Sequence, residues 1–142
     1  MGSALHRLLQ WQSTDAAPLT AVALEFALTK EQTRSVQNSA NHMLNGEAAW
    51  IWDERQIDWQ ANEYELFQDG KLLRLDRLVR HRETKMWWVI DFKSALEPEK
   101  STALRAQLFA YKEAVSAAFD ISQSAVQTAF VSGDGRLINS GF

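Results

Sequence analysis

The run MWWVIDFKS at residues 86–94 restricts the possible folds of this chain more than any other segment. Its apolar residues follow one another continuously, which predicts a central strand covered on both faces. Successive strand side chains point to opposite faces, so Asp91 and Lys93 share one face and Ile90 and Phe92 the other. A plain ion pair would explain this arrangement, and so would a metal-dependent active site. The rest of the sequence has to distinguish the two.

The segments around this strand predict an α/β fold. Residues 58–67 and 72–80 alternate in polarity around Asp69-Gly70, which indicates a β-hairpin. A long amphipathic helix is predicted from Pro98, followed by a strand at 125–131 and a possible edge strand at 136–142. The apolar stripe of this helix consists of Leu104, Leu108, Tyr111, Val115 and Ala118. Three antiparallel strands, a crossover helix and a further strand together predict a mixed central sheet flanked by helices.

The first 55 residues are predicted to be helical. Apolar spacing indicates one helix that begins almost at the first residue and a second at 19–28, after Pro18. Thr29 and Gln32 form the pattern of a capping box for a third helix that ends near Gly46. We therefore expect one domain over residues 1–142, with a helical segment at 1–55 and an α/β core at 56–142. A helix that follows Met1 at once suggests a fragment of a longer protein.

Composition excludes several classes of protein. With 142 residues, 46% hydrophobic and 23% charged, the chain has the composition of a globular domain. No apolar run approaches the roughly 18 residues of a membrane span, and no signal-peptide pattern is present. The absence of cysteine excludes disulfides, thiolate zinc sites and iron–sulfur clusters, and we expect a cytoplasmic protein. No GxxxxGK[ST] loop occurs, which excludes P-loop nucleotide hydrolysis.

The charged residues are unevenly distributed along the chain, whose net charge is -3. Residues 71–105 contain nine lysines and arginines against five acids, whereas residues 1–70 contain four against ten. The basic segment includes the central strand, which favours a phosphate-bearing partner at that place. An ordinary solvated surface is the alternative explanation.

Two carboxylates and a lysine are predicted to meet on adjacent strands. Asp76 shares its predicted face with the apolar Leu78, and a hairpin register that sets Asp76 beside Asp91 would crowd two negative charges. A divalent cation relieves that repulsion, and Mg²⁺ needs only one or two protein carboxylates. Such a cation would polarise a phosphodiester and acidify a water molecule. Lys93 could then position the water or neutralise charge in the transition state.

Several segments of the chain, in order, resemble one family. LRLDRLV, WWVIDFKS and AQLFAYKEAV are similar to the nuclease domain of the PD-(D/E)xK superfamily, in the RecB-like group at the C-termini of helicase-nucleases such as the exonuclease V beta subunit and AddA. The landmarks are Asp76 followed by arginine, the D-x-K of Asp91 and Lys93, and the Q-x-x-x-Y of Gln107 and Tyr111. GSALHRLLQW resembles the G-x-x-x-H-x-x-L helix of that family and contains its histidine.

The resemblance implies a restriction-endonuclease-like fold and a site that uses Mg²⁺ or Mn²⁺. It implies that Asp76 and Asp91 bind the metal, with His6 and the backbone carbonyl of Phe92 as further ligands, and that Lys93 assists catalysis. The segment NEYELF resembles the acidic strand of the family. Glu63 is the better match there, and Glu65 is its rival.

The resemblance also assigns Gln107 and Tyr111 to contacts with the nucleic-acid backbone, because they lie one helical turn apart on one face. The sequence departs from the family at two places. The proline of the superfamily name is missing before Asp76, and Leu73 stands where relatives often have glycine. Neither departure removes a chemical group from the predicted site.

These features predict a metal-dependent deoxyribonuclease, the exonuclease part of a RecB-like helicase-nuclease in DNA recombination and repair. Its expected partners are single-stranded DNA and a helicase domain or subunit. One alternative is a catalytically silent domain used for DNA binding or protein docking, and another is an enzyme that acts alone on structured DNA. For single residues, a packed interior His6 and an ordinary Asp91–Lys93 ion pair are the simpler explanations. His42 and His81 are expected to be structural or solvated.

Overall fold

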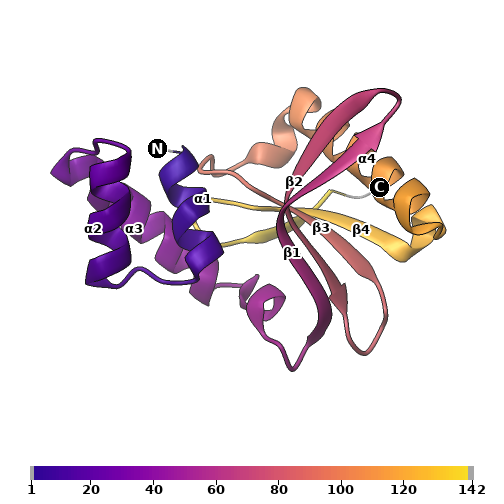
Figure 1. The fold of residues 1–142 in the computed structure, drawn as a ribbon, viewed down its shortest axis with the longest axis horizontal. Helices are drawn as coiled ribbons and strands as arrows, with labels where there is room; N and C mark the ends of the chain where they lie inside the picture. Colours follow the sequence, from indigo (N-terminus) through magenta and orange to yellow (C-terminus); the bar gives the residue numbers. More distant parts are fainter. Residues whose placement is uncertain (1, 141–142) are drawn as a thin grey trace.

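A five-stranded sheet of order β1-β2-β3-β4-β5 forms the centre of the computed structural model, which describes residues 2–140 (Figure 1). The strands are β1 Ile57–Gln68, β2 Lys71–His81, β3 Trp87–Phe92, β4 Val126–Val131 and β5 Leu137–Asn139. β3 and β4 are parallel, and the other neighbours are antiparallel. The predicted mixed sheet is therefore confirmed, and its connection between parallel strands contains the predicted helix. Of the predicted edge strand, Gly141 and Phe142 lie outside the described residues.

Helices cover both faces of this sheet. Those of the N-terminal segment are α1 Gly2–Trp11, α2 Ala16–Glu25, α3 Lys30–Asn45 and the 3-10 helix η1 Ala49–Trp52. Those of the core are η2 Pro98–Lys100, α4 Thr102–Phe119 and η3 Gln123–Ala125. In Figure 1, the N-terminal helices lie on one side of the sheet and α4 on the other. Among residues 2–140, no helix combines the length and apolarity that crossing a bilayer requires.

The start of the third helix agrees with the sequence, whereas the start of the second does not. Thr29 and Gln32 form the predicted capping box, and α3 ends before Gly46. The second helix was predicted from residue 19 but begins at Ala16, because Asp15 takes the extended N-cap conformation and Pro18 fits in the first turn.

The predicted start of the long helix at Pro98 is also wrong. Pro98 opens the separate turn η2, and the hydroxyl of Ser101 then accepts a hydrogen bond from Leu104 N at the start of α4. Ala118, predicted in the apolar stripe, is exposed near the end of α4. Sequence periodicity placed the helix correctly but not its start.

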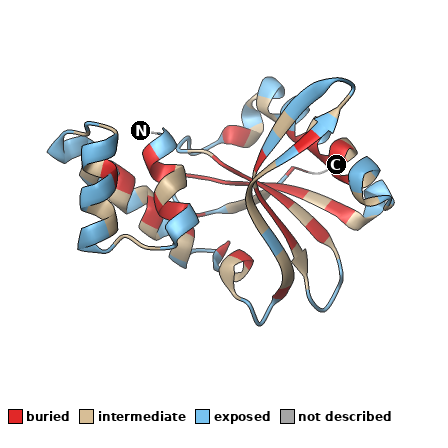
Figure 2. Cartoon of the chain, viewed as in Figure 1, coloured by how far each residue is buried: buried red, intermediate tan, exposed pale blue. Residues whose placement is uncertain are grey.

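Two apolar cores lie on the two faces of the sheet. The helical-side core, between the sheet and α1, α3 and η1, includes Leu8, Met43, Ile51, Val79 and Ile90. The α4-side core includes Leu75, Leu78, Val89, Leu108 and Phe130. Trp87 packs in the α4-side core and Trp88 against the helical-side core, as expected for a strand covered on both faces. Figure 2 shows the buried residues along the central strands.

The alternation of side chains along the β1–β2 hairpin reverses midway. Leu75 and Leu78 both pack in the α4-side core, although strict alternation would put residues three apart on opposite faces. Arg77 lies between them and points to the helical side, where it donates to Ile51 O. The strict alternation from which Asp76 and Leu78 were predicted to share a face therefore does not hold along this strand. The reversal falls at Glu63 and Asp76, which face each other between the pairs Asn62↔Arg77 and Tyr64↔Leu75.

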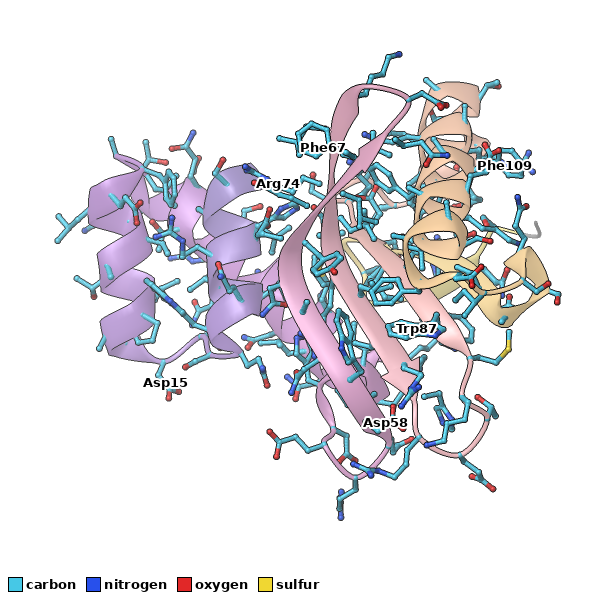
Figure 3. All side chains as sticks on the ribbon, turned by 45° about the vertical axis from the view of Figure 1, so that its right-hand side comes forward. Asp15, Asp58, Phe67, Arg74, Trp87 and Phe109 are labelled. Atoms are coloured by element: carbon cyan, nitrogen blue, oxygen red, sulfur yellow. The ribbon has the colours of Figure 1, made fainter. Side chains whose placement is uncertain are left out.

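A left-handed backbone at Glu63 accompanies this reversal. Its φ is 49°, a conformation that costs a residue with a side chain of this size some energy. The register between β1 and β2 is the same before and after it, so the hairpin turns its faces without slipping. Figures 1 and 3 show the strong twist of the hairpin, with Phe67 near its tip and Asp58 near its other end.

Candidate metal centre

Asp76 and Asp91 lie on adjacent antiparallel strands. The last pair between β2 and β3 is Arg77↔Ile90, and one further residue in the same register sets Asp76 opposite Asp91. The amide of Phe92 donates a hydrogen bond to Asp76 Oδ2 at 2.8 Å. Both aspartates are largely buried, with 12% of the Asp76 side chain and 5% of the Asp91 side chain exposed. The structure thus has the register that the predicted site required, with Asp76 beside Asp91.

The environment of Asp76 disfavours its charged form. Burial is the largest cause, followed by the adjacent Asp91 and by the charge of Glu63, and together they raise the pKa of Asp76 to about 9. The hydrogen bond from the amide of Phe92 opposes this shift in pKa but is too weak to cancel it. A carboxyl group in this position is stabilised by a proton or by a cation.

His6 and Glu63 bring two more donor groups to Asp76. His6 Nδ1 lies 3.5 Å from Asp76 Oδ1 and 3.6 Å from Glu63 Oε1. The ligand atoms of these three residues all lie within 4.8 Å of one another. Leu5, Leu8 and Leu9 of α1 are buried, and this packing fixes the helix that carries His6. The imidazole therefore faces the carboxylates and is not enclosed in an apolar core.

Glu63 and Glu65 have different surroundings. Glu65 is exposed and its Oε1 accepts a hydrogen bond at 2.9 Å from Arg74 Nη2, whereas Glu63 faces His6. The left-handed backbone at Glu63 falls where the hairpin reverses its faces, so the strained residue is the one beside the cluster. Of the two candidates from the acidic segment, only Glu63 has its carboxylate in the cluster.

The backbone carbonyl of Phe92 also faces this group. Phe92 O lies 3.4 Å from His6 Nε2, and the two rings meet edge to face at 5.9 Å. The phenylalanine ring itself stacks on Trp52, with centroids 5.8 Å apart, so β3 is held in place beside η1. The predicted backbone ligand therefore lies among the side chains that were predicted with it.

Lys93 follows the end of β3, and its amide continues the hydrogen bonding to β4 by donating to Val131 O at 3.0 Å. Its Nζ lies 3.3 Å from Asp91 Oδ2, and 30% of its side chain is exposed. Asp91 Oδ2 is buried and accepts no hydrogen bond from residues 2–140. Lys93 is therefore an ion-pair partner for Asp91 whose ammonium group also reaches solvent.

The two helix residues assigned to nucleic-acid contact differ in position. Tyr111 is buried, and its burial, together with the charges of Asp91 and Asp76, raises its pKa to about 12. The phenol therefore remains protonated at neutral pH, and it lies close enough to both aspartates for their charges to affect its pKa. Gln107 lies one turn earlier on α4 and is exposed. The shared face runs from the carboxylates out to solvent.

The residues of this cluster fit a hard divalent cation. Carboxylate and carbonyl oxygens with one imidazole are ligands that suit Mg²⁺ and Mn²⁺. His6, Glu63, Asp76 and the carbonyl of Phe92 would hold the ion, together with Asp91. The buried Asp91 Oδ2 without a hydrogen bond and the raised pKa of Asp76 are the features that a bound cation would compensate.

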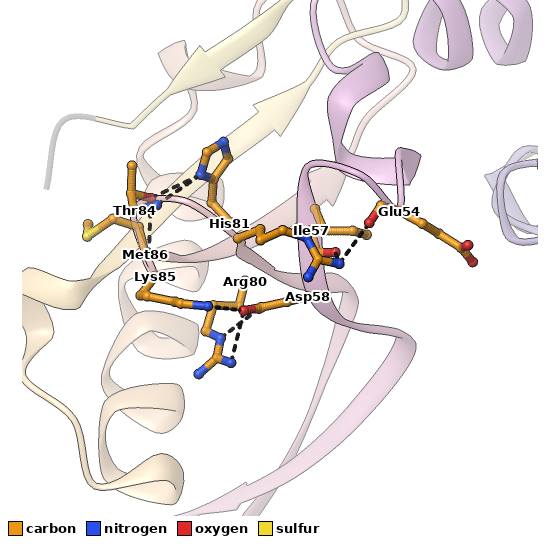
Figure 4. Close-up of polar contacts among 9 residues, drawn as sticks. Glu54, Ile57, Asp58, Arg80, His81, Thr84, Lys85 and Met86 are labelled. Carbon is orange, nitrogen blue, oxygen red and sulfur yellow. Dashed lines mark hydrogen bonds and ion pairs between the residues drawn. The ribbon is translucent and has the colours of Figure 1, made fainter.

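The basic segment 71–105 contributes less to the surface than its charge suggests. Arg77 is fully buried, donates to Ile51 O, Asn62 and Gln60, and has its pKa lowered to about 10 by burial. Arg80 and Lys85 both bind the carboxylate of Asp58 (Figure 4). Sequence reasoning assigned Arg77 no role, although its place between Leu75 and Val79 was a signal of burial.

Comparison with protein-family models gives a match over nearly the whole chain. The model for the PD-(D/E)XK nuclease superfamily matches residues 1–136. This range includes every residue of the cluster and both strands of the hairpin. A search of curated proteins gave no match.

Proposed function

The chain belongs to the PD-(D/E)XK nuclease superfamily, and from this premise we propose that it is a divalent-metal-dependent nuclease that hydrolyses phosphodiester bonds of DNA. The observation that carries this proposal is the convergence of His6, Glu63 and Asp76 within 4.8 Å, beside the buried Asp91. Three carboxylates and an imidazole from four separate elements have no common structural task here. We treat residues 1–142 as one nuclease domain, with the helical segment supplying His6.

The residues of the cluster divide the work between binding and chemistry. His6, Glu63, Asp76, Asp91 and the carbonyl of Phe92 would bind Mg²⁺ or Mn²⁺. When bound, such a cation supplies Lewis-acid activation of the phosphodiester and of the attacking water. The amide of Phe92 keeps Asp76 oriented through its hydrogen bond at 2.8 Å. Family membership alone does not establish activity, so the roles rest on this geometry.

Lys93 is suited to act on the reacting phosphate. Its ammonium group lies 3.3 Å from Asp91 and 30% of the side chain is exposed, so it can approach a phosphoryl oxygen without leaving the cluster. A cation there stabilises negative charge that develops on the oxygens in the transition state and can orient the attacking water. Tyr111 stays protonated and offers its hydroxyl to a phosphate oxygen, while Gln107 offers an exposed amide one turn away.

We further propose that the domain is the exonuclease part of a RecB-like helicase-nuclease and takes single strands from a helicase domain or subunit. The net charge of -3 supports this, as does the use of Arg77, Arg80 and Lys85 inside the fold. These three side chains are engaged within the fold and are not available to bind DNA without regard to sequence, so a partner would supply part of that affinity. A role in recombination and repair follows from such a partner.

Digestion of end-labelled DNA tests the proposed activity. We expect the protein to cleave linear single strands with Mg²⁺ or Mn²⁺ and to cleave nothing in EDTA. Circular single strands should stay intact, because an exonuclease needs a strand end. Asp91→Ala and Lys93→Ala should each remove cleavage while the far-ultraviolet circular dichroism spectrum is unchanged. Glu65→Gln is the matched control on the same hairpin and should cleave as the wild type does.

The same assay separates the rival function, a silent domain used for DNA binding or protein docking. That domain would leave DNA intact with either metal, and its DNA binding would be insensitive to Asp91→Ala. Full cleavage by either the Asp91→Ala or the Lys93→Ala variant would contradict the assignment of the site. Digestion of circular single strands would support the proposed nuclease activity but contradict the proposal that it is an exonuclease.

A further inference from the structure

A cavity of about 530 Å³ opens at the other end of β3 from the candidate metal centre. Its wall combines three rings (Trp50, Trp88 and His81) with three amide side chains (Gln56, Gln127 and Asn139). No acid, lysine or arginine lines it, although charged residues make up 23% of the chain. Such a lining suits a neutral, planar ligand with polar edges.

The rings form a fixed wall. Trp50 meets Trp88 edge to face with centroids 5.3 Å apart, and it meets His81 in the same way at 5.6 Å. Both tryptophans pack against the helical-side core and are only half-buried, so their inner edges are anchored while part of each ring borders the cavity. Rings held in this way offer stacking area without losing side-chain freedom when a ligand binds.

The amides lie on the strands and turn around these rings. Asn139 Nδ2 donates to Gln127 Oε1 at 3.0 Å, which holds the two side chains in register across β4 and β5. Gln56 Nε2 donates to Asp53 Oδ2 at 3.1 Å, which fixes the third amide. An amide can both donate and accept, and this matches the mixed donor and acceptor edge of a nucleobase.

The position of the cavity relates it to the metal centre. Trp88 precedes Asp91 by three residues on β3, a distance of about 10 Å along the strand. Trp88 packs on the helical side of the sheet, as does Phe92, whose carbonyl faces His6. Ile90 between them is buried in the helical-side core, so a DNA strand would reach both places around that core and not along β3. A base within a duplex is stacked and paired, so only an unpaired base could enter.

We propose that this cavity binds one unpaired nucleobase of the DNA strand, by stacking on the face of Trp50 or Trp88 with its edge against the other ring, and by hydrogen bonds from the amides. The identity of the ligand as part of DNA rests on the proposed function. The site would make DNA with unpaired bases the preferred substrate class, because duplex DNA cannot use it. It is separate from the metal centre and needs no metal ion.

Titration with 2′-deoxyadenosine in EDTA tests this site apart from catalysis, because the probe has a base but no phosphodiester bond. Indole N–H resonances of ¹⁵N-labelled protein, assigned with Trp50→Phe and Trp88→Phe, report on the rings directly. We expect both resonances to shift in a saturable way. Absence of a shift up to millimolar probe, or shifts confined to other tryptophans, would overturn the proposal.

Two matched variants extend the test to DNA. Gln127→Phe fills the cavity and removes one amide, whereas Gln68→Phe makes the same change at a half-buried strand position that lines no cavity described here. In EDTA, we expect the Kd for a labelled (dA)₁₂ oligonucleotide to rise at least about fivefold in Gln127→Phe, the effect of losing one stacked base, and to stay unchanged in Gln68→Phe. Equal Kd values for the two variants would also overturn the proposal.

The outcomes separate this site from the proposed function. If the protein binds the nucleoside at Trp50 and Trp88 but never cleaves DNA, the base site is supported and the proposed nuclease function is contradicted. If it cleaves DNA with a metal ion but its two indole resonances do not respond, the nuclease function is supported and the base site is contradicted. If Gln127→Phe does not fold, the wild-type indole resonances decide alone.

Discussion

The open end and the middle of the β1–β2 hairpin hold aspartates in opposite settings. Near the open end, Arg80 Nε and Nη2 donate to the carboxylate of Asp58 at 2.7 and 3.1 Å, and Lys85 Nζ lies 2.5 Å from it (Figure 4). These hydrogen bonds, first from Arg80 and then from Lys85, lower the pKa of Asp58 well below its usual range. At the reversal in the middle of the hairpin, the neighbours of Asp76 are Asp91 and Glu63, and its pKa is raised to about 9.

This difference distinguishes a structural carboxylate from a functional one. Asp58 has its compensating cations within the fold, so its charge stabilises the folded chain at neutral pH. Asp76 accepts a hydrogen bond from the amide of Phe92, and the carboxylates of Asp91 and Glu63 lie beside it. Lys93 pairs with Asp91, so the three carboxylates are partly compensated within the fold, and a divalent cation from solution would complete the compensation.

The largest expected effect comes from the same substitution at the two aspartates. Asp76→Asn should lower the rate of DNA cleavage at least about 100-fold, because it removes a metal ligand. Asp58→Asn should leave the rate per folded molecule within about threefold of the wild type, since its contacts are structural. Initial rates on end-labelled single strands with Mg²⁺ measure both. Equal losses of cleavage rate in the two variants would remove the distinction between the two aspartates.

Glu63 offers a finer comparison with Glu65. Glu63→Asn keeps a residue that tolerates positive φ but removes the carboxylate, so the affinity for Mn²⁺ should fall about 10- to 100-fold. Glu65→Gln is the control and should leave the affinity unchanged, because Glu65 pairs with Arg74. Electron paramagnetic resonance of free Mn²⁺ gives both affinities. An effect of Glu65→Gln as large as that of Glu63→Asn would show that the choice between the two glutamates is wrong.

The smallest expected effect is on thermal stability in EDTA, and its sign differs between the Asp76 and Asp58 variants. The folded-state pKa of Asp76 is raised from 3.8 to about 9, so its contribution to stability is present below pH 3.8 and lost as the pH rises through 9. Asp76→Asn removes this loss and should raise Tm by at least about 3 °C at pH 8. Its advantage over the wild type should shrink as the pH falls toward 4.

Asp58 should behave in the opposite way. Its lowered pKa means that its contribution is present above pH 3.8 and lost as the pH falls through the folded-state value. Asp58→Asn should therefore lower Tm at pH 8, and the difference from the wild type should narrow in acid. Calorimetric melting curves from pH 4 to 9 measure both variants. A lower Tm for Asp76→Asn at pH 8 would indicate that its carboxylate stabilises the metal-free fold.

Much of the fold was predictable because short-range signals agree with the tertiary structure. Asp69-Gly70 gave the hairpin and its register, and the unbroken apolar run at 86–92 gave the central strand. The predicted site required a register that sets Asp76 beside Asp91, and β2 and β3 have that register. The family match supports the resemblance at the level of the superfamily. The individual roles of the site residues remain proposals.

Other features depend on three-dimensional contacts that periodicity does not encode. A positive φ at a glutamate has no sequence signature, so the reversal at Glu63 and Asp76 could not be read from alternation. The burial of Arg77 depends on the carbonyl of Ile51 from a distant 3-10 helix. The start of α4 was missed because the side chain of Ser101 caps it, while Pro98 belongs to a separate turn.

Titration calorimetry with Mn²⁺ tests the central claim most directly, because the claim concerns a cluster of carboxylates whose negative charge a divalent cation would balance. The account predicts saturable binding to the wild type and to Asp58→Asn, and none to Asp76→Asn under the same conditions. Equal binding by all three proteins, or no binding by the wild type, would contradict it.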